Sequence, residues 1–266
     1  MSPRVQTVLG DVKPEDLGVT LTHEHLAMDF THFYRKPPKH LADRFNFGIS
    51  LQTAGYLRQY PYSSKFNLVL NDQMSRDAVF NDVAYFKNYG GDFEIKAIKA
   101  AGTLQPHVGC GVSFHPHRVA EAPFEIVRLY LEAGGKADKL VMSHLDRTLL
   151  EQEKLLEFAE LGVYCQFDLF GVEVSYYQLN VETDMPSDAQ RIDLIKTLVD
   201  EGKEDRVLMS HDIHTKHRLV DFGGHGYSHI INNILPRMKT KGLSKATIDK
   251  ITIENPARWL TIDKDY

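Results

Sequence analysis

From residue 102 onward, short β-branched runs alternate with longer stretches in which apolar residues recur at helical spacing. The strands expected from the short runs cover residues 110–115, 139–144, 163–170 and 206–212. The helices expected between them cover residues 122–135, 150–162 and part of 188–201. Two further helices are expected to begin at residues 228 and 244. Such alternation is typical of βαβ units, so the sequence predicts an α/β fold with a parallel sheet.

The first third of the chain has a less regular pattern. One expected strand, residues 19–28, precedes a long stretch rich in Pro, Tyr and Phe that has no clear period. A long irregular segment inside a compact domain is typical of a structured loop over a site. A helix is expected at residues 75–89.

The pattern of strands and helices is interrupted after Gly90 and Gly91. The segment that follows again has helical spacing, with Ile95 and Ile98 on one stripe, so no strand is predicted between two successive helices. A parallel sheet needs a strand between its connecting helices. We therefore expect an internal deletion at positions 91/92 in a single domain of residues 1–266.

Composition narrows the class of protein. The 266 residues are enough for a sizeable core, and a net charge of −5 argues against nucleic acid or an anionic membrane as partner. No apolar run suits a signal peptide or a membrane span, which predicts a cytoplasmic protein acting on a small molecule. The unusual count is 13 histidines.

Several of these histidines stand at the ends of expected strands. His23 and His25 share one face of the first strand because side chains alternate with a period of two, and Glu24 takes the other face. His115, His144 and Asp212 close three later strands. Carboxyl ends of parallel strands meet at one rim, where imidazoles and a carboxylate are suitable ligands for zinc and similar cations. These five residues are the candidate metal ligands.

Each strand-end residue has an ordinary alternative when taken alone. A His–X–His pair is common at an exposed strand end, and Asp212 suits a turn. His117 has the same parity as His115, so spacing alone does not decide between them. His211 should point away from Asp212, as a packing residue or as a residue that supports the metal ligands. His225 and His229 are four residues apart, but the surrounding glycines favour a loop over a ligand pair.

Six motifs carry a resemblance to a known family. They are THEH (22–25), HPHR (115–118), VMSHLDRT (141–148), SHDIHTK (210–216), GGHGYSHI (223–230) and ENPARWL (254–260). Together they resemble the animal phosphotriesterase-related group of the phosphotriesterase family, in the amidohydrolase superfamily, over nearly the whole chain. The resemblance implies a TIM-type (β/α)8 barrel with two divalent metal ions, usually zinc, at its carboxyl rim.

The resemblance also implies a ligand set and a reaction. His23, His25 and Asp212 would hold one ion, and His115 and His144 the other. Asp212 would be both ligand and catalytic proton acceptor in a hydrolase whose metal-activated water attacks an ester or amide bond. The substrate would be a small acylated metabolite, for example an N-acyl amide such as N-acetyltaurine. Its contacts are expected in loops 29–71, 170–187 and 213–228, without assignment to single residues.

The chain departs from the family pattern at the interruption. The family places three further strands there, so about five parallel strands are expected here instead of the eight of a closed barrel. The bridging ligand of the family, a Glu or carboxylated Lys that ends one of those strands, is then missing. The alternative function is therefore a catalytically impaired, shortened homologue with at most a binding role.

Overall fold

The computed structural model describes residues 3–7, 10–45, 48–88, 91–93, 105–174 and 176–262. Its strands are β1 (Val5–Thr7), β2 (Gly10–Val12), β3 (Val19–Leu21), β4 (Gly91–Phe93), β5 (Val112–Phe114), β6 (Leu140–Met142), β7 (Tyr164–Phe167) and β8 (Val207–Met209). Its longer helices are α1 (Leu51–Gln59), α2 (Gln73–Asn88), α4 (Ala122–Glu132), α6 (Gln152–Ala159) and α7 (Asp188–Asp200). Its shorter helices are α3 (Gln105–Val108), α5 (Leu145–Thr148), α8 (Leu235–Thr240), α9 (Lys245–Asp249) and α10 (Asn255–Leu260).

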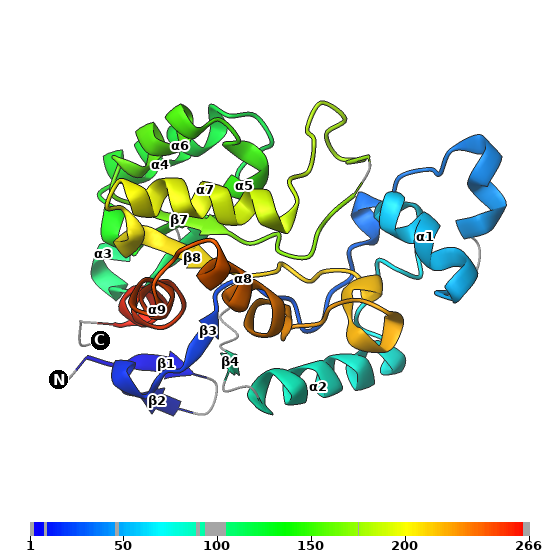
Figure 1. Ribbon diagram of the computed structural model, residues 1–266, viewed down its shortest axis with the longest axis horizontal. Helices are drawn as coiled ribbons and strands as arrows, with labels where there is room; N and C mark the ends of the chain where they lie inside the picture. The colour runs from blue at the N-terminus through cyan, green and yellow to red at the C-terminus, as the bar shows by residue number, and fades with distance from the viewer. Residues whose placement is uncertain are drawn as a thin grey trace.

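The central element is a four-stranded parallel sheet in the order β5-β6-β7-β8. A second parallel pair, β3 and β4, continues the arrangement, because the amide of Asp212 beyond β8 donates to the carbonyl oxygen of His23 beyond β3 over 3.1 Å. In Figure 1, α4, α6 and α7 lie on one side of β7 and β8, and α2 lies on the other side, near β4. The expected incomplete α/β barrel is confirmed.

Strand β4 corrects the prediction of a helix that starts directly after Gly91. Residues 91–93 pair in parallel with residues 19–21, which brings the parallel strands in the described part of the chain to six rather than five. The edge of β3 supplies backbone hydrogen bonds that helical spacing in the sequence does not reveal. The remainder of the predicted helix, at residues 94–104, lies outside the described residues.

Helix α7 shows how the sequence starts an element and secures it. Ser187 caps the helix because its side chain accepts a hydrogen bond from the Gln190 amide. In return, the Ser187 amide donates to the side-chain oxygen of Gln190. Ile192 and Ile195 are buried in the main apolar cluster. Arg191 is fully buried as well, and its guanidinium pairs with carboxylates at 2.9 and 3.0 Å. The helix is thus anchored beneath the strands that end at the rim.

Gly111, directly before β5, has no room for a side chain. A Cβ there would lie 2.3 Å from Nε1 of Trp259, which is buried and donates to the carbonyl oxygen of Lys139 over 3.1 Å. We expect Gly111→Ala to lower the free energy of unfolding by about 1–3 kcal/mol, because the indole must leave its hydrogen bond. Gly55→Ala in α1, where nothing lies within 4 Å, is the control and should be neutral or stabilising. Urea denaturation measures both, and equal midpoints would contradict the expectation.

The helices of the described residues are short relative to a lipid bilayer. None of them combines the length and apolarity needed to cross a membrane.

Candidate metal centre

The end of β3 and the loop after β8 bring the first three candidate ligands together. Nε2 of His25 lies 3.0 Å from Oδ1 of Asp212, and Nε2 of His23 lies 3.3 Å from the same oxygen. As the alternation of side chains predicts, Glu24 points the other way and lies 2.8 Å from the His211 imidazole. The two histidines and Asp212 therefore offer two nitrogens and one oxygen to a common point.

The other two candidate ligands meet at the ends of β5 and β6. Nε2 of His144 lies 2.7 Å from Nδ1 of His115, and the ring centroids are 4.2 Å apart. His144 also stands next to His23, with ring centroids 5.1 Å apart. All five predicted residues thus gather at one rim.

Asp168 belongs to this cluster, although the sequence analysis did not select it. Its carboxylate is completely buried, and its two oxygens lie 2.6 Å from Nδ1 of His144 and 2.9 Å from Nδ1 of His23. It follows directly after β7, so its place at the end of a parallel strand was the signal that could have found it. Because Asp168 touches one imidazole from each pair, it connects the two halves of the centre.

Backbone conformation singles out two of the cluster residues. Apart from glycines, His144 (φ 57°) and Asp212 (φ 51°) are the residues with left-handed backbone in the described part of the chain. This conformation costs free energy for a residue with a Cβ, and such strain concentrates at functional sites. Here it ends the strand and turns the side chain toward the rim.

Charge is distributed unevenly within the cluster. Burial opposes a charged imidazole at His23, but Asp212 and Asp168 outweigh this and raise its pKa to about 9. Burial and the neighbouring His144 and Arg147 lower the pKa of His115 to about 3. At His23 a cation must therefore displace a proton, whereas His115 is already neutral.

The donor atoms fit divalent cations. Two groups have three donor atoms within 4.8 Å of one another, namely His23 with His25 and Asp212, and His23 with His144 and Asp168. Nitrogen and carboxylate donors in such sets suit zinc and other borderline metals. His115 contacts His144 but completes neither group of three, so its assignment as ligand stays a prediction.

The expected loss of the bridging carboxylate also stays a prediction. Glu94 follows β4 in the sequence, but it lies outside the described residues. Neither group of donors contains a Glu or Lys.

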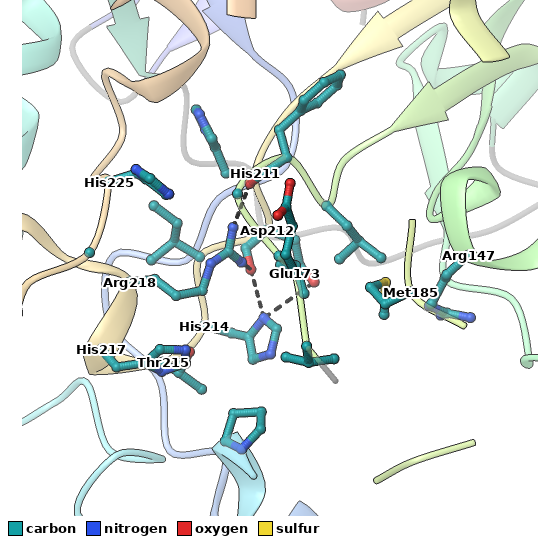
Figure 2. A pocket seen from close by; sticks show the side chains of 18 of the residues that line it. Arg147, Glu173, Met185, His211, Asp212, His214, Thr215, His217, Arg218 and His225 are labelled. Carbon is teal, nitrogen blue, oxygen red and sulfur yellow. Dashed lines mark hydrogen bonds and ion pairs between the residues drawn. The ribbon is translucent and has the colours of Figure 1, made fainter. Parts of the chain in front are cut away.

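A cavity of about 390 Å³ opens onto the cluster, and all three predicted loops contribute to its wall. Tyr62 comes from the first loop, Met185 from the second and His214 from the third. Figure 2 shows Arg147 and Met185 toward one side of the cavity and Arg218 and His225 toward the other. This volume suits a small organic molecule.

The remaining histidines fall outside the donor groups. His211 is buried, and its Nε2 accepts from the Ile230 amide over 3.1 Å. His225 and His229 stack with centroids 4.1 Å apart, and His229 lies 2.7 Å from Asp188. In the described residues this pair joins no group of three donors, and His117 joins none either.

Comparison with known proteins adds a family assignment. The sequence model of the phosphotriesterase family matches residues 3–92 and 89–260. The phosphotriesterase-related protein of Drosophila yakuba is 44% identical in an alignment of 346 positions that covers 97% of this chain and 99% of the relative. The protein of Drosophila melanogaster shows the same identity and coverage.

Solved structures share the fold. A resiniferatoxin-binding protein from Rhodobacter sphaeroides superposes with a TM-score of 0.86 at 21% identity, covering 97% of this chain and 94% of the other. At this identity the likeness concerns the fold alone. Sequence and fold agree, and the chain is therefore a member of the phosphotriesterase family, whose members are metal-dependent hydrolases.

Proposed function

We propose that this chain hydrolyses an ester or amide bond in a small acylated metabolite, with N-acetyltaurine as the first candidate among N-acyl amides. The observation that carries the proposal is the convergence of His23, His25 and His144 on two aspartates at the cavity. These are Asp168 and Asp212, and His115 lies against His144. Paired donors of this kind beside a cavity suit hydrolysis better than binding alone.

The proposed ligand sets follow from these contacts. His23, His25 and Asp212 would hold one divalent ion, and His115 and His144 the other, with zinc as the proposed metal. When bound, the ions would polarise the scissile carbonyl and lower the pKa of a water molecule. Asp168 fixes the orientation of two of the imidazoles through their Nδ1 atoms.

Asp212 is the proposed proton acceptor. Its Oδ1 faces His23 and His25, while its Oδ2 lies 3.3 Å from Nδ1 of His214. Nearby histidines outweigh burial and hold the pKa of Asp212 well below its usual range, so the carboxylate is ionised, as a metal ligand must be. His214 borders the cavity, and its Nδ1 donates to the backbone carbonyl oxygen of Asp212 over 2.6 Å, which holds the imidazole beside the carboxylate.

The alternative proposal is an impaired, shortened homologue. Two observations support it: the matched family segments meet at residues 89–92, and the alignment with the relative spans 346 positions against 266 residues here. A chain without the family's bridging carboxylate would hold its metals more weakly and position the attacking water less well.

We propose a small-molecule substrate as the partner, with neither nucleic acid nor a membrane, in keeping with the net charge of −5. We propose the cytoplasm as location, since Cys110 and Cys165 are both free, as is usual in a reducing compartment.

Elemental mass spectrometry of the purified chain, paired with an assay of N-acetyltaurine hydrolysis, tests the proposal. We expect two metal equivalents, and turnover that disappears on chelation and returns with zinc. The matched control is the same chain with the family's internal segment restored at positions 91/92. At most one equivalent and no turnover in the short chain, with two equivalents and turnover in the restored one, would favour the impaired homologue.

A further inference from the structure

Two arginines, Arg118 and Arg147, stand in the cavity wall, and Arg147 lies beside His115. Nη2 of Arg147 lies 3.2 Å from Nε2 of His115 and donates to the carbonyl oxygen of Pro116 over 3.3 Å. Nε of Arg118 donates to the hydroxyl of Tyr177 over 2.8 Å, and its guanidinium lies 5.7 Å from the centre of that ring. All of these side chains except that of Pro116 line the cavity.

Neither guanidinium has a carboxylate partner among the described residues. Arg147 is only 3% exposed, and its contacts are a carbonyl, a hydroxyl and an imidazole. Arg191, equally buried, pairs instead with Asp146 and Asp188. A buried cation without a counter-ion is costly, so an anion that enters the cavity gains most beside Arg147.

Among the described residues, the nearby carboxylates form no ion pair with either arginine. Asp146 pairs with Arg191 through Oδ2, and Asp168 contacts His23 and His144. Glu173 lines the same cavity, where one of its oxygens accepts from the Asp188 amide over 3.0 Å. The positive charge of Arg118 and Arg147 is therefore available to a ligand.

We propose that Arg118 and Arg147, together with the Tyr177 hydroxyl, bind a carboxylate or sulfonate group of the substrate. The inference rests on the proposed function, because it assumes that the scissile bond of the substrate lies beside His115 and His144. A short spacer in the substrate would then connect this bond to the anionic group. Apolar side chains of Val174, Leu179 and Met185 also line the cavity and suit the spacer. Guanidinium groups recognise such oxyanions through paired hydrogen bonds.

Binding of uncleavable ligands tests the proposal. The probes are ketone analogues of N-acetyltaurine and N-acetyl-β-alanine, in which a methylene replaces the amide NH, and the neutral analogue of N-acetylethanolamine. Titration calorimetry on the purified chain, before and after chelation, should show at least about tenfold tighter binding of the anionic analogues. The tighter of the two identifies the preferred group, sulfonate or carboxylate.

Three variants assign the preference to its residues. Arg118→Gln, at a half-buried position, should remove most of the preference. Arg147→Lys keeps the buried positive charge but loses the paired N–H donors of the guanidinium. This variant should reduce the preference for anionic analogues. Arg128→Gln is the matched control, since Arg128 pairs with Glu125 and Glu132 on the exposed face of α4 and should leave the preference unchanged.

Two results would overturn the anion site: equal binding of neutral and anionic analogues, or full preference in Arg118→Gln. Failure of the proposed function looks different. Anion preference that depends on Arg118, in a chain that holds no metal and hydrolyses nothing, would keep the site and reject the hydrolase. Hydrolysis of N-acetylethanolamine as fast as of N-acetyltaurine, without anion preference, would keep the hydrolase and reject the site.

Discussion

The variant His23→Ala is expected to lose all hydrolytic activity and at least one equivalent of bound metal. His23 is the residue shared by both groups of donors, because Nε2 faces Asp212 and Nδ1 faces Asp168. Alanine removes a donor from each group and leaves the buried Asp168 carboxylate with one imidazole fewer. The loss of metal affinity should exceed the roughly 10–100-fold typical of residues that only hydrogen-bond to the metal ligands.

His229→Ala is the matched control for metal content. His229 is also a buried histidine, at 5% exposed, and it lies 2.7 Å from a carboxylate, that of Asp188, but it belongs to no donor group in the described residues. Its metal equivalents should equal those of the unmodified chain, as measured by elemental mass spectrometry. Unchanged turnover or full metal content in His23→Ala would refute the metal assignment.

The second large effect is expected at Asp168. Its carboxylate accepts from the backbone amide and Nδ1 of His144 at 3.0 and 2.6 Å, from Nδ1 of His23 at 2.9 Å, and from Nε2 of Gln166 at 2.6 Å. Asparagine has one acceptor oxygen, so Asp168→Asn must turn an amide donor toward at least one of these donors. We expect metal affinity to fall about 10–100-fold in both halves of the centre.

The control for this variant is Asp188→Asn. Asp188 is another buried aspartate that binds an imidazole, that of His229, and it also accepts from Arg191. Both variants lose a buried charge and should unfold more easily than the unmodified chain, but Asp168→Asn alone should lose metal. Competitive chelator titration reads the affinity. A parallel loss of metal in both variants would mean that instability, not imidazole orientation, is the cause.

Patterns among residues close together in the sequence predicted many of the strands and helices of this protein. The expected strands appear as β3, β5, β6, β7 and β8, and the convergence of His23 and His25 follows from alternation along a single strand. The structure shortens these strands, since His144 and Asp212 adopt left-handed backbone beyond their ends. The spacing of apolar residues predicted the helices, because it depends only on residues within a few positions of one another.

Contacts between distant segments required the tertiary structure. Asp168 meets His23 across 145 positions because β7 pairs with β8, which lies beside β3. The pairing of β4 with β3 and the isolation of Arg147 from any carboxylate in the described residues likewise depend on which strands become neighbours. Strand order and register are set by the packing of the whole sheet, and a local period contains neither. The strand-end chemistry was therefore visible along the chain, while the carboxylate that connects its two halves emerged only from the fold.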